Sequence, residues 1–364
     1  YRLMIDDASK TGDLTSLLKE QRAYFASGAT RDIRFRMEAL DRLEKVLISH
    51  RDALLEALAQ DLGKPEVEAY LAEYYFLLQE LRLIRKSSSR WLKTKAVKSP
   101  VYFLPCKSQL RRDPFGMVLI VAPWNYPMQL SLSPLIAAVA AGNTVVLKPS
   151  EMAPACEQLL AKMISEAFSP EHVAVVIGDS QVANNLTDQV FDFVFFTGST
   201  HIGKIVAAKA AQNLTPNIME LGGKCPCIVD ASAKVDIAAQ RILNGKFFNG
   251  GQTCFAPDYV VVAEEVKDAL VEAMKVKLST VPWGEEMAHV INERHYDRLE
   301  QLIPDDALKF GEDNRAELRL APRLLPEVDW NSQVMQEEIF GPLLPILSYS
   351  DYANLLDHLA KYDS

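Results

Sequence analysis

Cys254 has the strongest local context for a nucleophile in this sequence. It ends the run Phe-Asn-Gly-Gly-Gln-Thr-Cys at residues 248–254, directly after a glycine pair and just before a predicted strand. Glycines let a backbone approach a ligand closely and leave amide groups free to face it, and such donors stabilise a thiolate. The alternative is that Cys254 is a small buried hydrophobic residue, and its local context taken alone favours that alternative.

An amide and two acids lie in settings that suit the transfer of charge or protons. Asn125 lies in Pro-Trp-Asn-Tyr-Pro after a predicted strand, and its amide could donate a hydrogen bond to a developing oxyanion. Glu220 lies between apolar residues, where partial burial would raise its pKa toward that of a general base. Glu338 precedes the turn signal Phe-Gly-Pro. The alternatives are turn formation for the amide, a paired acid for the first glutamate and a surface acid for the second.

Residues 197–204 could bind a phosphate. They read Thr-Gly-Ser-Thr-His-Ile-Gly-Lys between a predicted strand and a predicted helix, with Gly198 and Gly203 bracketing four residues that begin with Ser199. The run is close to a P-loop, but Ile205 stands where the P-loop needs Ser or Thr. A glycine turn that leads into a helix N-terminus still suits an anionic phosphate. An ordinary strand–helix turn explains the run equally well.

Lys148 and Glu151 follow another predicted strand. Ligands of open parallel sheets bind beyond the carboxyl ends of the strands, so these two side chains could meet ribose hydroxyls or a phosphate. A surface ion pair is the alternative. The histidines show no paired metal spacing, and Cys225-Pro-Cys227 is too tight and too isolated for zinc, so we expect no metal site.

Composition excludes several classes of protein. The chain has 364 residues, of which 49% are hydrophobic and 24% charged, as in ordinary globular proteins. Its 39 Lys and Arg against 48 Asp and Glu give a net charge of −9, which disfavours a nucleic-acid partner. Polar residues interrupt the apolar stretch 116–147, so we expect no membrane span. The five cysteines are odd in number and sparse, which predicts a reducing, cytoplasmic location.

The elements that must position these residues follow an alternating pattern. Residues 11–95 have apolar spacings of three and four, which predict helices with a break at Gly63-Lys64-Pro65. Later, short apolar runs predict strands at 117–122, 144–147, 173–177, 191–196, 217–221 and 227–229. The predicted helices between them are 128–141, 153–168 (capped by Ser150), 181–186 and 202–212. This alternation predicts a parallel sheet with helices on both faces.

A second domain is predicted to start near Gly222-Gly223, which interrupts the pattern. Beyond it lie helix 235–248, strand 258–262 and helix 264–278. Earlier in the chain, seven basic residues and no acid fall between Arg82 and Lys98. We interpret them as a solvated helix face.

Six motifs in a fixed order carry a family resemblance that none of them carries alone. They are Pro123-Trp-Asn-Tyr-Pro127, Leu147-Lys-Pro-Ser-Glu151, Phe196-Thr-Gly-Ser-Thr200 with Gly203, Met219-Glu-Leu-Gly-Gly-Lys224, Gly251-Gln-Thr-Cys254 and Gln336-Glu-Glu-Ile-Phe-Gly-Pro342. Together they resemble the aldehyde dehydrogenase superfamily, over nearly all of the chain from about Arg31. Cys254-Phe-Ala-Pro-Asp-Tyr259 and the short N-terminal region are most similar to the class 3 branch, which includes fatty, aromatic and coniferyl-type aldehyde dehydrogenases.

The resemblance implies an NAD(P)-dependent oxidation of an aldehyde to a carboxylic acid. Cys254 would be the nucleophile that forms a thiohemiacetal, and Asn125 together with the Cys254 backbone amide would hold the oxyanion. Glu220 would activate the water that hydrolyses the resulting thioester. A CoA-acylating enzyme, in which coenzyme A resolves the thioester, is the alternative, although acylating members usually lack that base.

The resemblance also implies a cofactor site. The residues expected to bind the cofactor are Lys148 and Glu151 at the adenosine ribose, Gly198, Ser199 and Gly203 beside the pyrophosphate, and Glu338 and Phe340 at the nicotinamide ribose and ring. Glu151 can bind both ribose hydroxyls and would repel a 2′-phosphate, a repulsion that Lys148 partly offsets. NAD is therefore the expected cofactor, with NADP accepted.

The implied fold is α/β, with two Rossmann-like parallel-sheet domains and a small oligomerisation sheet. Residues 1–222 would form the NAD(P)-binding domain, with about 91–113 contributing to an oligomerisation arm, and residues 223–364 the catalytic domain. The family continues past the position of Ser364, so the C-terminal part of the catalytic domain, where class 3 relatives sometimes carry a membrane anchor, is expected to be absent. The expected partners are a small-molecule aldehyde and a second copy of the chain in a homodimer.

Overall fold

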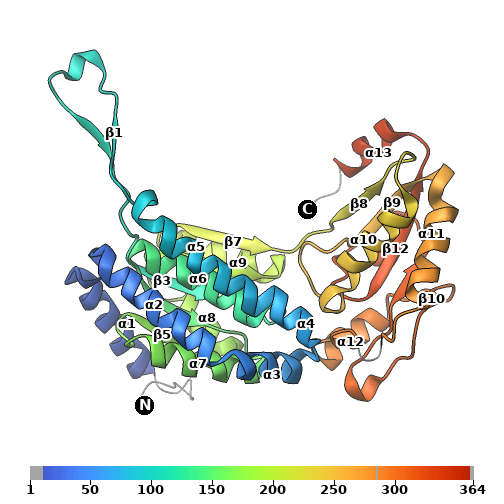
Figure 1. Ribbon diagram of the computed structural model, residues 1–364, viewed down its shortest axis with the longest axis horizontal. Coiled ribbons are helices and arrows are strands. Elements are labelled where there is room, and N and C mark those ends of the chain that lie inside the picture. The colour runs from blue at the N-terminus through green and yellow to red at the C-terminus, as the bar shows by residue number, and fades with distance from the viewer. Residues whose placement is uncertain (1–10, 284–285, 361–364) are drawn as a thin grey trace. The chain divides into compact units, whose positions relative to one another are not determined.

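The computed structural model describes residues 11–283 and 286–360, and the chain divides into two compact units. Unit 1 consists of Tyr1–Leu58 and Ala69–Glu220, and unit 2 consists of Ala59–Glu68 and Leu221–Ser364. Each unit contains its own five-stranded sheet (Figure 1). The segment Ala59–Glu68 belongs with the C-terminal unit although it lies among the N-terminal helices in sequence, and no sequence feature indicated this.

The sheet of unit 1 has the strand order β5-β4-β3-β6-β7. Its strands are β3 (Met117–Val121), β4 (Thr144–Lys148), β5 (Val173–Val175), β6 (Phe193–Gly198) and β7 (Asn217–Leu221). β3 pairs in parallel with β4 and β6, and β4 pairs in parallel with β5. Because the order runs outward from β3 in both directions, the connecting helices cover both faces. The predicted α/β architecture is confirmed.

Two layers of helices cover one face of this sheet. α6 (Pro127–Ala141) and α7 (Pro154–Ala167) connect β3 to β4 and β4 to β5, and α2 (Ile33–Ser49) and α5 (Phe76–Trp91) pack on α6. Figure 1 shows α2 and α5 side by side over α6. α2 buries Leu40, Leu43 and Leu47, whose spacing forms the predicted apolar stripe. The other helices of unit 1 are α1 (Thr11–Ala26), α8 (Ser180–Thr187) and α9 (Thr200–Gln212), while α3 (Arg51–Leu62) and α4 (Glu66–Ala69) span the boundary between the units.

Ser150 does not cap α7, contrary to the sequence prediction. The N-cap position is Ala153, which makes no side-chain cap, and the Ser150 hydroxyl instead accepts the Met152 N–H at 3.3 Å in the preceding turn. Pro154 does lie in the first turn, as predicted. Proline disfavours a helical conformation in the residue before it, so the helix begins at Pro154 and not nearer to Ser150.

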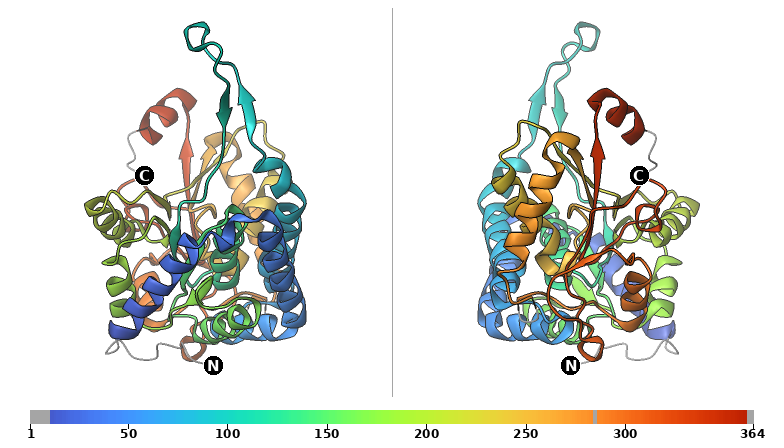
Figure 2. Two further views of the ribbon diagram at one scale, coloured as in Figure 1. Left: turned by 90° about the vertical axis from the view of Figure 1, so that its left-hand side faces the viewer. Right: turned by 90° about the vertical axis from the view of Figure 1, so that its right-hand side faces the viewer.

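A short hairpin extends away from the rest of unit 1. β1 (Lys95–Val97) pairs antiparallel with β2 (Ser108–Leu110), and both views in Figure 2 show the pair standing clear of the helices. Its tip carries apolar side chains in solvent, with Val101 79% and Tyr102 82% exposed. Such an apolar tip is typical of a surface that another protein covers.

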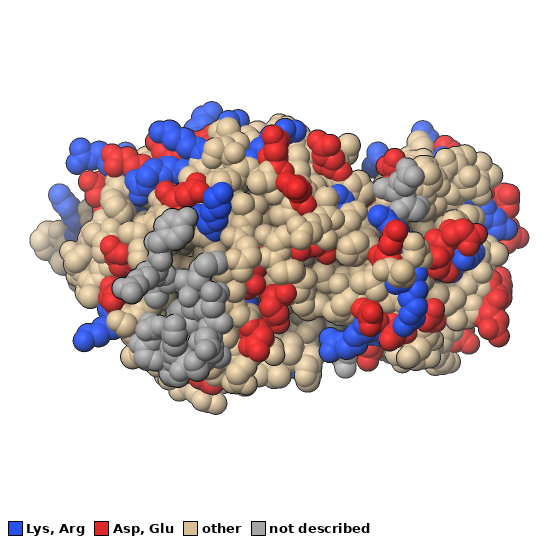
Figure 3. Space-filling model, turned by 90° about the horizontal axis from the view of Figure 1, so that it is seen from below, with Lys and Arg blue, Asp and Glu red and all other residues tan. Residues whose placement is uncertain are grey.

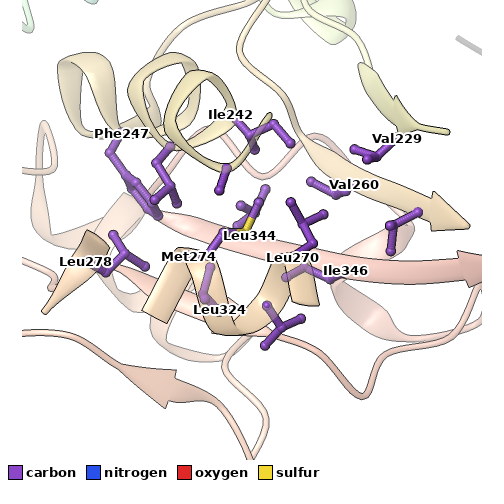
Figure 4. Packing of buried hydrophobic residues seen from close by; sticks show 14 of the residues in the cluster. Val229, Ile242, Phe247, Val260, Leu270, Met274, Leu278, Leu324, Leu344 and Ile346 are labelled. Atoms are coloured by element: carbon purple, nitrogen blue, oxygen red, sulfur yellow. The ribbon is translucent and has the colours of Figure 1, made fainter. Parts of the chain in front are cut away.

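The sheet of unit 2 has the order β10-β11-β12-β9-β8, and all neighbours are parallel except β10 and β11. Its strands are β8 (Pro226–Val229), β9 (Tyr259–Ala263), β10 (Leu308–Lys309), β11 (Arg323–Leu325) and β12 (Leu343–Tyr349), and its helices are α10 (Val235–Phe247), α11 (Glu264–Leu278), α12 (Glu293–Glu300) and α13 (Tyr352–Leu359). Figure 4 shows Val260 and Ile346 of the sheet meeting Leu270 and Met274 of α11. This buried layer fixes the sheet against its helices.

Charged side chains of both signs are interspersed on the face drawn in Figure 3. Within the basic run of residues 82–98, Arg82 pairs with Glu44 at 2.7 Å, and Arg85 pairs with Glu44 and Asp41 of α2. These pairs support the interpretation of a solvated helix face. Among the described residues, no helix combines the length and the apolar character needed to cross a membrane.

The end of α6 provides a test of this packing. Gly142 has φ 96°, and a Cβ there would lie 2.5 Å from the Cζ of Arg36, whose Nε donates to Thr30 O at 2.7 Å. We expect Gly142→Ala to lower the free energy of unfolding by about 2–3 kcal/mol, because left-handed strain and a clash add together. Gly28→Ala, at φ 80° with its nearest atom 3.6 Å away, is the matched control and should cost about 1 kcal/mol. Urea denaturation measures both; equal losses would show that Arg36 moves aside freely.

Candidate active site

Unit 1 gathers predicted site residues at one edge of its sheet. Asn125 lies in the loop after β3, Lys148 ends β4 and Gly198 ends β6. The carboxyl ends of parallel strands meet at the same edge, and here they include the point where the strand order changes direction. We call this edge the carboxyl edge of unit 1. It is the position in which open α/β sheets bind ligands.

Lys148 is fully buried at this edge and lies among oxygen atoms. Its Nζ is 3.5 Å from Glu151 Oε2 and 3.6 Å from Glu157 Oε1, and it also donates to Pro149 O. Burial raises the pKa of Glu157, and the Lys148 charge opposes that rise. The structure therefore places Lys148 and Glu151 in one ion pair, and their role at a ribose stays a prediction.

Glu157 was missed by the sequence analysis. It follows Cys156 in α7 and shares the buried face of that helix with Leu160 and Ile164, at spacings of three and seven. An acid on an apolar stripe is the signal that could have identified it, because a buried carboxylate requires a charged or hydrogen-bonding partner.

The turn after β6 has the features of an anion site. Ser199 caps α9 and accepts the Ile202 N–H at 3.4 Å, while Gly203 lies buried within the first turn of that helix. The Thr197 hydroxyl, just before Gly198, is buried and has no hydrogen-bond partner. An unsatisfied buried hydroxyl beside a helix N-terminus fits a ligand with acceptor oxygens. The residues at this edge therefore fit an anionic ligand that carries acceptor oxygens.

Asn125 and Glu220 differ in exposure. Asn125 is 4% exposed, as a preorganised amide donor would be. Glu220 is exposed near the end of β7, so the partial burial expected from its apolar neighbours is wrong. The reason is that β7 is an edge strand of the sheet, where flanking apolar residues do not enclose a side chain. Its role as general base stays a prediction.

Unit 2 places its site residues at the amino ends of its strands. Lys224 precedes β8, Cys254 and Asp258 precede β9, and Glu338 precedes β12. These three strands are parallel neighbours, so the loops that enter them meet at one edge. We call this the amino edge of unit 2. It brings Cys254 and Glu338, predicted from different motifs, to the same side of one sheet.

The loop before Cys254 has an unusual backbone. Asn249, Gly250 and Gly251 all have positive φ, at 54°, 64° and 76°. A Cβ on Gly250 would lie 2.7 Å from Ala288 O, and one on Gly251 would collide with Gly341 O. Both positions therefore require glycine. Cys254 follows this loop as a half-buried thiol that forms no disulfide.

Asp258 connects the loops of the amino edge. It is 4% exposed, and its two oxygens accept the Lys224 Nζ at 2.6 Å and the Ile339 N–H at 3.0 Å. Lys246 Nζ lies 3.9 Å away. Burial lowers the pKa of Lys246 to about 8, against the opposing charge of Asp258.

Neither Asp258 nor Lys246 was identified from the sequence as a site residue. Lys246 lies on the buried face of α10 with Leu243 and Phe247, at helical spacing, and that position was a usable signal. Asp258 stands directly before the apolar strand β9. An acid there can equally be a surface residue at a strand end, so its sequence context alone does not reveal its burial.

Glu338 and Phe340 occupy the loop before β12. Burial raises the pKa of Glu338 to about 7, helped by the nearby Asp258 charge and opposed by the Gly223 N–H and by Lys246. Phe340 has φ 50°, a rare backbone conformation for an aromatic residue. Glu338 also lies so close to Gly222 that a Cβ there would collide with its carboxylate. The loop is thus held against the Gly222-Gly223 turn.

Cys225 and Cys227 are poor nucleophile candidates, and the described residues contain no cluster able to hold a metal. Burial raises the pKa of both Cys225 and Cys227. The Cys225 thiol donates to Cys254 O at 3.5 Å, so it supports the loop of Cys254. Chemically, unit 1 offers a buried amide and a helix N-terminus that suits an anion. Unit 2 offers a thiol at the same sheet edge as Glu338, a carboxyl group whose pKa burial raises to about 7.

The chain matches the model of the Aldehyde dehydrogenase family over residues 5–361. It is 43% identical over 338 residues to 4,4'-diaponeurosporen-aldehyde dehydrogenase of Staphylococcus aureus (strain NCTC 8325 / PS 47), covering 91% of this chain and 74% of that protein. It is 37% identical over 359 residues to Aldehyde dehydrogenase family 3 member H1 of Arabidopsis thaliana, covering 95% and 74%. The solved structure described as the substrate bound state of Staphylococcus aureus AldH is similar with a TM-score of 0.92 at 40% identity, covering 96% of this chain and 78% of that one.

These relatives confirm the resemblance drawn from the six motifs, including its class 3 character. The family model covers residues of both units, so the carboxyl edge of unit 1 and the amino edge of unit 2 both lie within the matched region. The chain belongs to the aldehyde dehydrogenase family, whose enzymes oxidise aldehydes with a nicotinamide cofactor.

Proposed function

We propose that this chain oxidises an aldehyde to a carboxylic acid through a covalent thioester on Cys254. The observation that carries the proposal is the half-buried Cys254 thiol, which directly follows a left-handed turn that requires glycine at positions 250 and 251. Sulfur attack turns an aldehyde, a poor hydride donor, into an alkoxide-like donor.

Cys254 Sγ attacks the carbonyl carbon and forms the thiohemiacetal. The oxyanion that develops accepts hydrogen bonds from the Asn125 amide and from the Cys254 backbone N–H. The bound cofactor supplies the hydride acceptor. Loss of hydride leaves a thioester, and Glu220 takes a proton from the water that hydrolyses it. The exposure of Glu220 suits contact with water.

Seven residues are proposed to hold the cofactor. Lys148 and Glu151 would hold the adenosine ribose, and Gly198, Ser199 and Gly203 would hold the pyrophosphate, since the α9 N-terminus favours negative charge. Glu338 holds the nicotinamide ribose and Phe340 packs near the ring. The partner-free Thr197 hydroxyl supports this assignment.

The assembly and location complete the proposal. The exposed apolar tip of the β1–β2 hairpin supports a role for residues 91–113 in a homodimer. We assign NAD(P) binding to residues 1–222 and catalysis to residues 223–364, and propose a cytoplasmic enzyme. The CoA-acylating alternative is not favoured, because Glu220 is present and neither of the two relatives named above is described as CoA-dependent. Release of free acid without coenzyme A tests this point.

Removal of the nucleophile gives the most direct test. We expect Cys254→Ala to abolish aldehyde-dependent formation of reduced cofactor, because no thiohemiacetal can form, while NAD binding measured by calorimetry stays nearly unchanged. Cys106→Ala, which removes an exposed thiol near the hairpin tip, is the control and should retain activity. Retained turnover in Cys254→Ala would remove Cys254 from its role.

The water-activating step is separable from hydride transfer. We expect Glu220→Gln to retain the initial burst of reduced cofactor in stopped-flow absorbance, while steady turnover falls by about 10²–10⁴-fold because the thioester persists. Acid quench followed by mass spectrometry should find the acyl group on Cys254. Loss of the burst itself would place Glu220 earlier in the reaction, for example in activation of the thiol.

Cofactor preference depends on one charge. We propose that NAD is preferred and NADP accepted, because Glu151 repels a 2′-phosphate and Lys148 partly offsets it. At equal cofactor concentrations, NAD should give the higher rate. Glu151→Gln should raise kcat/KM for NADP relative to NAD by about tenfold, since a charge repulsion of roughly 1–2 kcal/mol is removed. Glu166→Gln, which alters an exposed acid of α7, is the matched control. An enzyme active with NADP alone would contradict the proposal.

A further inference from the structure

Glu68 lies far from Cys254 in the sequence and yet contacts its loop. Glu68 ends the segment Ala59–Glu68, which belongs to unit 2. Its Oε2 accepts the backbone N–H of Asn249, with 3.0 Å between the two heavy atoms. Asn249 is fully buried, so its N–H requires a partner within the protein. A side chain remote in sequence meets that requirement.

The hydrogen bond from Asn249 to Glu68 lies at the residue of the loop whose backbone conformation is the least favourable. Asn249 begins the three-residue left-handed turn, a conformation that costs most L-residues about 1–2 kcal/mol and asparagine less. Gly250 and Gly251 follow without that cost. The strain is therefore concentrated at Asn249, whose N–H is the group that Glu68 holds.

A second set of hydrogen bonds joins the end of the loop to its beginning and to residues 289–291. The Gln252 side chain donates to Asn249 O at 3.1 Å and to His289 O at 2.9 Å, and it accepts the Ile291 N–H at 3.1 Å. The Asn249 side chain donates to Gln252 O at 3.1 Å. Glu68 thus anchors the beginning of the loop and Gln252 its end, two residues before Cys254.

The surroundings of Glu68 favour its neutral form more than those of an exposed glutamate do. Burial raises its pKa to about 7, and the Glu286 charge adds to this rise, whereas the Asn249 N–H and the Lys64 charge oppose it. An acceptor oxygen is present on either protonation form of a carboxyl group. Whether the side chain is long enough to reach the Asn249 N–H therefore matters more for this hydrogen bond than whether it is charged.

We propose that Glu68 is a positioning residue that holds the left-handed turn in the one conformation that presents the Cys254 thiol and backbone N–H to the carbonyl. This inference rests on the proposed role of Cys254. It gives the segment Ala59–Glu68 a role in positioning the loop of Cys254 at the amino edge of unit 2. Neither the sequence of the segment nor the steps of the proposed reaction indicated that role.

Two variants of Glu68 separate reach from charge. Glu68→Gln keeps an acceptor oxygen at the same distance without charge, whereas Glu68→Asp keeps the charge and is one methylene too short. We expect Glu68→Gln to retain most of kcat and Glu68→Asp to lose on the order of 10²-fold, the size expected for a misplaced reacting group. The dissociation constant for NAD should be unchanged in both, because the proposed cofactor residues of the adenosine end lie in unit 1. Glu272→Asp, which shortens an exposed acid of α11, is the matched control.

A direct readout of the thiol accompanies the kinetics. The rate of Cys254 alkylation by iodoacetamide, followed by peptide mass spectrometry, should change in Glu68→Asp and not in Glu68→Gln, with circular dichroism melting curves verifying that both are folded. Wild-type kcat and alkylation in Glu68→Asp, or equal losses in both variants, would overturn the inference. If only the inference about Glu68 fails, Cys254→Ala is still inactive. If the proposed function fails, Cys254→Ala retains turnover, so the two outcomes are distinguishable.

Discussion

The buried carboxylate of Asp258 is the interaction on which the amino edge of unit 2 depends. It joins Lys224 before β8, its own position before β9, and Ile339 before β12, so one side chain fixes three separate loops. Burial of a charge costs free energy unless the charge is fully paired. Removal of one partner would therefore leave an uncompensated charge buried among the remaining groups. An electrostatic requirement therefore holds together the three loops that enter β8, β9 and β12.

The two units present opposite ends of their strands, and this determines which donors are available. At the carboxyl edge of unit 1, helices begin after the strands, so backbone N–H groups and the α9 dipole supply positive potential for an anion. At the amino edge of unit 2, the loops enter strands and no such helix start is offered. Positive charge there comes from side chains, and Lys224, Lys246 and Arg298 surround Asp258 and Glu338. The end of the strands at which a site lies therefore decides whether backbone N–H groups or charged side chains supply its positive potential.

The sequence predicted much of unit 1 because its signals are local. β3 and β4 are short apolar runs bounded by Gly116 and Pro123 or by Asn143 and Pro149, and helix patterns alternate with them. β10, β11 and β12 were not predicted, because two of them have only two or three residues and the pattern after Leu278 is irregular. The expected burial of Glu220 was wrong, since its apolar neighbours lie on an edge strand.

Contacts between segments distant in sequence explain what remained hidden. The motif around Cys254 marked the glycines, but not the reason for them, which is the close approach of Ala288 O and Gly341 O. Glu68 carries no motif, and its importance arises only because Ala59–Glu68 packs with residues found some 180 positions later. A strained turn is stable only if surrounding groups hold it. A residue that supports such a turn needs a side chain long enough to reach it and a buried acceptor oxygen. Neither property produces a recognisable pattern in a single sequence.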